Sequence, residues 1–319
     1  ATAIQPTRTP SGDPSQPSKK QASPLHQSLA VPSSQSTYHY VAGFPRTLST
    51  LITNMSGSAS DLVQATSPAD GVRLITLNRP EKRNALSRQL IAEFLRQLSG
   101  ASTDPGVRAI VITGNGPFFS GADLNDIAVL DAAGARSCRY LEDLCSGMAA
   151  VRKPVLAAVN GPALGGGFEV ALMCDLIVAA KSAYFALPET NRGLIPGAGG
   201  TQRLTAAVGK FRAMRTILLG RPMTAEEAMS CGLLCDLVED GDMLPRAIDV
   251  ATDLVGHGPE ALQSAKEAIC RADGLGRDDL LERHLYYATF GTEEKRRGVD
   301  EFLARRTRPA GGPADAAAA

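Results

Sequence analysis

Two glutamates of this chain stand beside glycines in segments that are otherwise apolar. Glu169 comes directly after the triple glycine at 165–167 and Phe168. Glu189 lies between an apolar, strand-like run at 183–187 and a second glycine-rich stretch. Because glycine has no Cβ, other groups can approach its backbone N–H closely. Two carboxylates next to open amides provide the parts for acid–base chemistry on a carbonyl compound.

The segments around Glu169 predict a turn from a strand into a helix. Residues 154–159 form an apolar run typical of a strand, and residues 168–174 read as a buried helix. Such a turn directs unpaired N–H groups into open space at the positive end of the helix dipole. Glu169 follows Gly166 by three residues, so its carboxylate can face the same space. A helix N-terminus stabilised by an acid in its first turn also explains this segment taken alone.

Two more segments carry glycines where a backbone amide can be exposed. After Glu189 come Gly193 and the cluster at 197–200, and a helix-like run follows. The apolar, β-branched run at 107–113 predicts a buried strand, and Phe-Phe-Ser-Gly-Ala-Asp follows it at 118–123. Taken alone, each segment is also explained as a loop whose glycines serve turns. Their combination with the first glutamate favours a functional site.

Together these segments resemble the crotonase (enoyl-CoA hydratase/isomerase) family over roughly residues 68–308. The family patterns F-x-x-G-A-D and L-N-R-P-x-x-x-N-A-L are matched at 118–123 and at 77–86. The family's two catalytic glutamates stand twenty residues apart, as Glu169 and Glu189 do. The resemblance implies an α/β fold, the ClpP/crotonase-like spiral of ββα repeats, with a C-terminal helical trimerisation region. Strands that alternate with helical runs are independently typical of an α/β protein.

The resemblance also implies a role for each matched residue of the catalytic centre. The N–H groups of Ala122 and Gly166 would form an oxyanion hole for a thioester oxygen. Glu169 would act as the general base, and Glu189 would deliver a proton to C2 of the acyl chain. The N–H of Gly197 would help to hold the reacting water.

Contacts to coenzyme A are implied on two loops. The loop at 77–86 would wrap the nucleotide end, where Lys82 or Arg83 would meet the phosphates. The other expected coenzyme or substrate contacts are Ala122, Asp123, Leu124 and Gly166. Asp123 is mainly structural in the family, so we assign it no catalytic role. Many hydratases have a lysine where this chain has Asn125, which puts one cationic contact in doubt.

The implied activity is that of an enoyl-CoA hydratase, a hydro-lyase. Such an enzyme adds water reversibly, in syn geometry, to a 2-enoyl-CoA and gives a 3-hydroxyacyl-CoA. No separate cofactor and no metal are expected, since coenzyme A is part of the substrate. An enoyl-CoA isomerase and a methylglutaconyl-CoA-type hydratase on the same fold are the alternatives. Isomerases commonly keep only the second glutamate, so Glu169 favours a hydratase. The acyl chain length, its branching, the pathway and the physiological direction stay open.

Charge and hydropathy limit the classes of partner that this chain can have. The chain has 33 basic and 33 acidic residues, so no overall field attracts nucleic acid or an anionic membrane. The non-enzymatic alternative is an RNA-binding or scaffold role. The sequence lacks the basic stripe with interleaved aromatic residues that would favour it. No uncharged apolar run reaches the length of about 18 residues that a membrane span requires. The expected partners are an acyl-CoA and, by the resemblance, further copies of the chain in a homotrimer or a hexamer of two trimers.

The cysteines and histidines do not predict a metal site or a catalytic triad. There are four histidines, and no C-x-x-C pair occurs. We expect reduced, mostly buried thiols in an intracellular protein rather than a disulfide framework. The six cysteines are Cys138, Cys145, Cys174, Cys231, Cys235 and Cys270.

Composition divides the chain into an extension at 1–60, a core at 61–256, a helical region at 257–308 and a tail at 309–319. The extension is rich in Ser, Thr, Pro and Gln, which predicts disorder, as for the tail. Its basic, acid-poor composition is also typical of a mitochondrial transit peptide, although a low-complexity tail explains it too. We expect the mitochondrial matrix, with the cytoplasm and the peroxisome as alternatives. Residues 209–308 are expected to be helical except for one strand at 234–238, with a capping box at Thr224.

Overall fold

The computed structural model describes residues 62–116, 119–274 and 276–307. Its centre is a six-stranded sheet in the order β1-β2-β3-β4-β6-β9. β1 and β2 are antiparallel, and the other neighbouring strands of this sheet are parallel. The strands are β1 (Val63–Ala69), β2 (Val72–Leu77), β3 (Ala109–Gly114), β4 (Val155–Val159), β6 (Leu176–Ala180) and β9 (Asp236–Val238).

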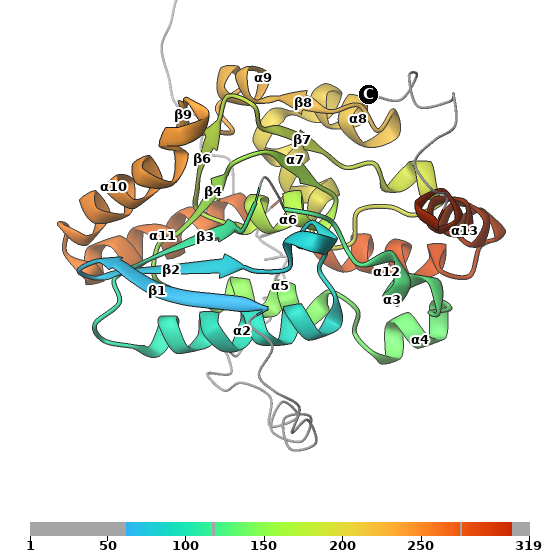
Figure 1. The fold of residues 1–319 in the computed structure, drawn as a ribbon, viewed down its shortest axis with the longest axis horizontal. Helices are drawn as coiled ribbons and strands as arrows, with labels where there is room; N and C mark the ends of the chain where they lie inside the picture. Colours follow the sequence, from blue (N-terminus) through green and yellow to red (C-terminus); the bar gives the residue numbers. More distant parts are fainter. Residues whose placement is uncertain (1–61, 117–118, 275, 308–319) are drawn as a thin grey trace, which may run out of the picture. The chain divides into compact units, whose positions relative to one another are not determined.

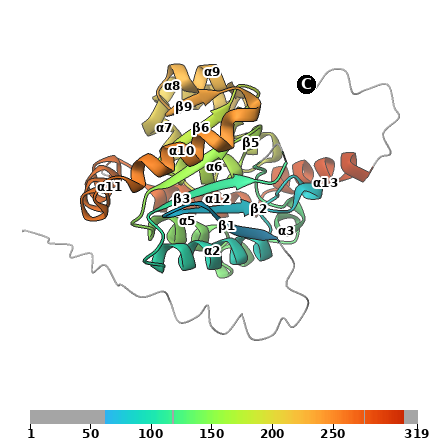
Figure 2. The same cartoon turned by 60° about the vertical axis from the view of Figure 1, so that its left-hand side comes forward.

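Helices cover both faces of this sheet (Figure 1; Figure 2). Alternate residues of a strand face opposite sides, and β3 shows both sides. Ile110 packs in the core beneath α2 (Arg88–Thr103), whereas Val111 packs in a second core beneath α10 (Met243–Val255). Burial on both faces explains why β3 and β4 read as continuous apolar runs, and both predicted strands are confirmed.

The chain repeats the order strand, strand, helix as it passes between this sheet and a smaller one. β4 is followed by β5 (Pro162–Leu164) and α6 (Gly166–Met173). β6 is followed by β7 (Tyr184–Ala186), the single turn η3 (Glu189–Arg192) and α7 (Gly200–Val208). β5 and β7 are parallel neighbours in the smaller sheet, and α6 contacts α7. The repeat confirms the expected spiral and brings the glycine turns before α6 and α7 close together.

The C-terminal half contains one strand more than expected. β8 (Met223–Thr224) pairs antiparallel with β7, so the prediction of a single strand within 209–308 was wrong. Two residues carry no periodic pattern, and this strand forms because the Met223 side chain, 2% exposed, is buried beside Phe185. The predicted capping box is confirmed, since Thr224 and Glu227 exchange two hydrogen bonds of 3.1 Å.

The remaining elements are helical. Within the described ranges, no helix has both the length and the apolar character needed to cross a membrane. The predictions for residues 1–60 and for the tail at 309–319 lie outside the described residues, and the boundary at 256 stays a prediction. The other helices are α3 (Leu124–Ala128), α4 (Ala132–Ser137), α5 (Glu142–Ala149), α8 (Lys210–Leu218), α9 (Ala225–Ser230), α11 (Pro259–Gly274), α12 (Asp279–Thr289) and α13 (Glu293–Thr307).

The cysteines are more exposed than predicted. All six are free, Cys235 and Cys270 are exposed, and the other four are half-buried. Cys138, Cys174 and Cys231 each lie directly after a helix, where Sγ donates to a carbonyl of the last turn. Helix ends lie at the margin of the core, which explains why the prediction of mostly buried thiols was wrong.

Candidate active site

Glu169 lies in the first turn of α6 and is 1% exposed. Its Oε1 accepts hydrogen bonds from the N–H of Ala198 at 2.7 Å and from the N–H of Gly200 at 2.8 Å. This approach requires a glycine at 200, because a Cβ there would lie 2.8 Å from the same oxygen. Two backbone donors therefore hold the Glu169 carboxylate against the start of α7.

Glu189 begins η3, and its carboxylate lies against the turn that leads into α6. Its Oε1 is 2.8 Å from the position that a Cβ on Gly165 would occupy. Gly165 has a φ of 54°, a left-handed conformation that favours glycine, so the turn and the close approach both depend on it. The other oxygen, Oε2, is buried and has no hydrogen-bond partner among the described residues. The two glutamates thus flank the N-terminus of α6, one held by donors and one open.

Burial raises the pKa of both carboxyl groups. For Glu169, the negative charge of Glu282 raises the pKa further, whereas the two backbone donors lower it. For Glu189, the charge of Glu169 is the second cause after burial. Since like charges in a buried site oppose joint ionisation, the two groups titrate as a pair that readily retains one proton.

The N–H groups of Ala122 and Gly166 lie close together beside this pair. A Cβ on Gly166 would lie 3.4 Å from the nitrogen of Ala122. Leu86 donates to the carbonyl of Gly121 at 3.0 Å and accepts from Asp123 at 3.1 Å, so the N–H of Ala122 points away from that ladder. Gly166 is the first residue of α6, and such an N–H has no partner inside its own helix. Among the described residues neither N–H has an acceptor, so both are open to a ligand.

Asp123 is committed to structure. Its carboxylate pairs with the guanidinium of Arg79 at 2.8 Å and accepts from the backbone and side-chain nitrogens of Asn125 at 3.1 and 2.8 Å. Burial opposes ionisation, but these partners hold the pKa of Asp123 below its usual range. Asp123 thereby caps α3, which begins at Leu124, and fixes the backbone next to Ala122. Asn125, found where many hydratases have lysine, contributes to this capping.

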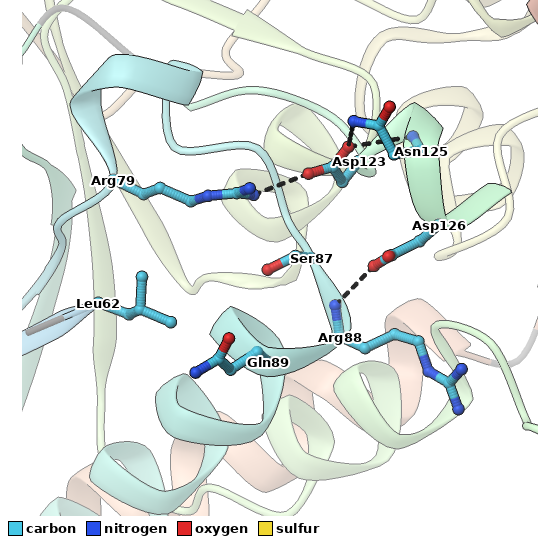
Figure 3. Close-up of a pocket in the computed structure, with 8 residues that line it drawn as sticks. All are labelled: Leu62, Arg79, Ser87, Arg88, Gln89, Asp123, Asn125 and Asp126. Atoms are coloured by element: carbon cyan, nitrogen blue, oxygen red, sulfur yellow. Dashed lines mark hydrogen bonds and ion pairs between the residues drawn. The ribbon is translucent and has the colours of Figure 1, made fainter. Parts of the chain in front are cut away.

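The loop at 77–86 is fixed by its own contacts. Asn84 is buried, accepts from the N–H of Arg79 at 2.8 Å and donates to a backbone carbonyl at 3.0 Å. Lys82 and Arg83 are exposed, and neither lines the polar cavity of about 430 Å³ beside Asp123 (Figure 3). Their contact with coenzyme phosphates stays a prediction.

Neither glutamate lines the polar cavity beside Asp123. Cavities of about 430 and 340 Å³ occur in the described part of the chain, and neither is lined by Glu169 or Glu189. Among these residues no group of three or more His, Cys, Asp or Glu side chains is arranged to hold a metal ion. Glu169 is enclosed by protein in this structure, whereas Glu189 is half-buried with its Oε2 buried.

Glu282 of α12 is a further buried carboxylate at this site, and it was not predicted from the sequence. It is 2% exposed and accepts from the N–H of Gly199 at 2.5 Å and from the N–H of Thr201 at 2.8 Å. One turn later, the Tyr286 ring packs against Gly197, where a Cβ would come within 2.4 Å of the ring. An acid four residues before a tyrosine on the buried face of a helix was the available signal. Water binding by the N–H of Gly197 stays a prediction.

Comparison with known proteins identifies the family. The family model described as enoyl-CoA hydratase/isomerase matches residues 68–311, and the chain belongs to this family. The predicted family, fold and enzyme class are thereby confirmed.

Individual relatives are similar over most of their length. The 2,3-dehydroadipyl-CoA hydratase of Escherichia coli strain K12 is 42% identical over 239 residues, which cover 74% of this chain and 93% of that protein. A probable enoyl-CoA hydratase of Mycobacterium bovis is 42% identical over 238 residues, 74% of this chain and 92% of its own. The crystal structure of an enoyl-CoA hydratase from Mycobacterium avium subsp. paratuberculosis K-10 has a TM-score of 0.69 at 29% identity, covering 76% of this chain and 100% of that one.

Proposed function

We propose that this chain is an enoyl-CoA hydratase that adds water in syn geometry to a 2-enoyl-CoA and gives a 3-hydroxyacyl-CoA. One observation carries the proposal. Two carboxylates, the buried Glu169 held by two N–H groups and Glu189 with a buried, unpartnered oxygen, lie beside the open amides of Ala122 and Gly166. A hydratase needs both an acid and a base near one carbonyl oxygen, and this arrangement supplies them. An isomerase needs only one carboxylate, so the presence of two favours hydration.

The open amides stabilise the charge that forms during the reaction. As water adds at C3, negative charge develops on the thioester oxygen, and the N–H groups of Ala122 and Gly166 bind that charge better than the ground state. Loss of one such donor typically costs about 2.7–4 kcal/mol of transition-state energy. The position of Gly166 at a helix N-terminus adds the favourable end of the dipole.

The hydrogen bonds support different roles for the two carboxylates. Glu169 accepts from two backbone N–H groups, which favour its ionised form, so it acts as the base that takes a proton from water. Glu189 has a buried oxygen without a donor and faces the charge of Glu169, so it retains the proton that it delivers to C2. In dehydration the same two steps run in reverse.

The substrate class follows from the family, which acts on acyl-CoA thioesters. The name of the E. coli relative adds an unsaturated dicarboxylyl thioester to the acyl groups worth assaying. Because Glu169 is 1% exposed, the acyl group reaches it only when the side chains that cover it move. No separate cofactor takes part in this proposal, since coenzyme A arrives with the substrate.

A homotrimer, or a hexamer of two trimers, is part of the same proposal. The helix α8 supports it by presenting Phe211, Met214 and Leu218, which are 86%, 43% and 61% exposed. These residues lie at helical spacing on one side of α8, and an exposed apolar stripe of this kind is typical of a subunit contact. The proposed location in the mitochondrial matrix rests only on the composition of residues 1–60, with the cytoplasm and the peroxisome as alternatives.

The rate of hydration should follow a bell-shaped pH profile. Glu169 must be ionised and Glu189 protonated, so kcat/KM rises when the pair loses its first proton and falls when it loses the second. Burial and mutual repulsion raise both pKa values, so both limbs should lie above about 4.3, the ordinary value for glutamate. Initial rates in buffers of constant ionic strength measure this profile. An acid limb at or below the ordinary value, or no decline on the alkaline side, contradicts the assignment.

A further inference from the structure

The backbone N–H groups of residues 198–201 are divided between two buried carboxylates. Those of Ala198 and Gly200 donate to Glu169, whereas the other two donate to Glu282. Successive N–H groups of this turn therefore alternate between an acceptor on α6 and an acceptor on α12. A displacement of the Glu282 side chain moves the same short stretch of backbone that holds Glu169.

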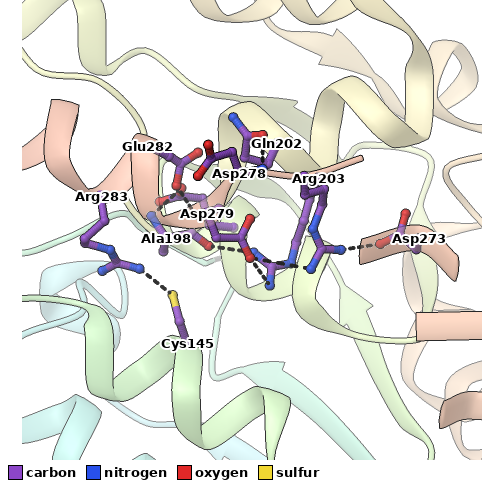
Figure 4. A network of polar contacts seen from close by, with 12 residues as sticks. Cys145, Ala198, Gln202, Arg203, Asp273, Asp278, Asp279, Glu282 and Arg283 are labelled. Atoms are coloured by element: carbon purple, nitrogen blue, oxygen red, sulfur yellow. Dashed lines mark hydrogen bonds and ion pairs between the residues drawn. The ribbon is translucent and has the colours of Figure 1, made fainter. Parts of the chain in front are cut away.

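The contacts of Glu282 satisfy both of its oxygens. Oε1 accepts from the N–H of Gly199 at 2.5 Å, and Oε2 accepts from the N–H of Thr201 at 2.8 Å and from the hydroxyl of the same threonine. Figure 4 shows Glu282 and Arg283 of α12 beside Ala198 at this turn. A buried carboxylate with three donors is fixed in position, which makes it suited to orient the backbone around it. Burial raises the pKa of Glu282, and its three donors oppose that rise.

We propose that Glu282 is a positioning residue for hydration: through the turn at 198–201 it sets the place of the Glu169 carboxylate and the negative charge beside it. The proposal rests on the proposed function, because it assigns Glu169 the role of base. It adds that α12, far away in the chain, completes the acid–base centre. Glu282 itself touches neither water nor substrate in this account.

The charges around Glu282 support this role. Glu169 on α6 and Glu189 on η3 are acidic groups that interact with it, and Arg283 on its own helix is a basic one. Arg203 of α7 is a second basic group at this turn and donates to the carbonyl of Ala198 at 3.3 Å. After burial, the charge of Glu282 is the main cause that raises the pKa of Glu169. Arg283 donates to the thiol of Cys145 at 3.1 Å and to a backbone carbonyl, so it does not neutralise the three acids by a direct ion pair.

The test is Glu282→Gln, assayed for hydration of a short 2-enoyl-CoA across pH. Glutamine keeps the size of the side chain but removes the charge and turns an –NH2 group toward backbone donors. We expect kcat to fall about tenfold, the loss typical for a hydrogen bond to a charged group, with KM unchanged within about twofold. The acid limb of the kcat profile should move to lower pH, because Glu169 then ionises more readily.

Two further variants separate the effects of the Glu282 charge, the position of its carboxylate and the packing of α12 against the protein. Asp279 lies on the same helix as Glu282 and forms ion pairs with Arg203 of α7 at 3.7 Å and with Arg277 at 3.5 Å. Asp279→Asn removes these pairs and should lower the melting temperature without moving the acid limb. Glu282→Asp keeps the charge but shortens the reach, so kcat should fall while the acid limb stays in place. This variant also provides the test if Glu282→Gln does not fold.

The outcomes distinguish this proposal from the proposed function. Wild-type protein that does not hydrate any 2-enoyl-CoA refutes the hydratase itself. Active wild type together with an unchanged kcat and pH profile in Glu282→Gln refutes only the positioning role. A lower melting temperature in Glu282→Gln with no shift of the acid limb, as expected for Asp279→Asn, refutes it too. For Glu282→Asp, a wild-type kcat is the contradicting result.

Discussion

Replacing Glu189 by glutamine is expected to lower kcat for hydration of a short 2-enoyl-CoA at least about 10²-fold, within the usual range for general acid–base catalysis. The amide has nearly the same shape but cannot deliver a proton to C2. Glu169→Gln should lose at least as much, because an amide cannot take a proton from water. KM should change little, since neither side chain is assigned a contact with coenzyme A. Steady-state kinetics of both variants measures these losses.

Both variants should remain folded. In Glu169→Gln the remaining side-chain oxygen can still accept from Ala198 and Gly200. The pKa of Glu189 is higher in the folded than in the unfolded chain, so its stabilising contribution is full below the unfolded value and is lost as the pH rises through the folded value. Glu189→Gln should therefore melt at the same or a higher temperature than wild type at alkaline pH. Glu260→Gln, at an exposed position of α11, is the matched control and should have wild-type kinetics. Near-normal turnover in either active-site variant would falsify the acid–base roles.

Gly166→Pro is expected to lower hydration about 10²–10³-fold, as for the loss of an oxyanion-hole donor. Proline has no N–H, and the first helical position otherwise tolerates its ring. The preceding turn at Gly165, with a φ of 54°, is restricted further by a following proline, which can add to the loss. The loss should appear in kcat, because the donor binds charge that develops only in the transition state.

The matched control is Gly166→Ala, which keeps the N–H. Its Cβ would lie 3.3 Å from Leu86 Cδ1 and 3.4 Å from the nitrogen of Ala122, so a small adjustment accommodates it and the loss should be clearly smaller. Gly165→Ala is unsuitable, because its Cβ would lie 2.8 Å from Glu189 Oε1. Circular dichroism and oligomer size must match wild type for the comparison to hold. A correctly folded Gly166→Pro protein with full activity shows that the thioester oxygen binds elsewhere.

Local patterns predicted the elements that carry the two glutamates. The runs that became β3 and β4 are buried on both faces, so their continuous apolar character was a direct signal. The glycines before α6 and α7 predicted close backbone approach, and at Gly165 and Gly200 a Cβ would meet a glutamate oxygen. These features depend on neighbours within a few residues, which is why the sequence alone sufficed.

Features that depend on distant parts of the chain were not predicted. Glu282 and Gly199 are 83 positions apart, and no local pattern indicates that one accepts a hydrogen bond from the other. β8 forms because the Met223 side chain is buried beside β7. The sequence of a two-residue segment does not indicate such a tertiary contact. Asp123 and Arg79, 44 positions apart, form an ion pair that only the folded chain shows. Tertiary contacts decided each of these cases.

We propose that the chain adds water across the double bond of a 2-enoyl-CoA. Mass spectrometry of the thioester product after turnover in H₂¹⁸O, and separately in D₂O, tests it most directly. We expect one ¹⁸O in a 3-hydroxyl group and one deuterium at C2. A product that carries no ¹⁸O and in which the double bond has only moved contradicts hydration and identifies an isomerase.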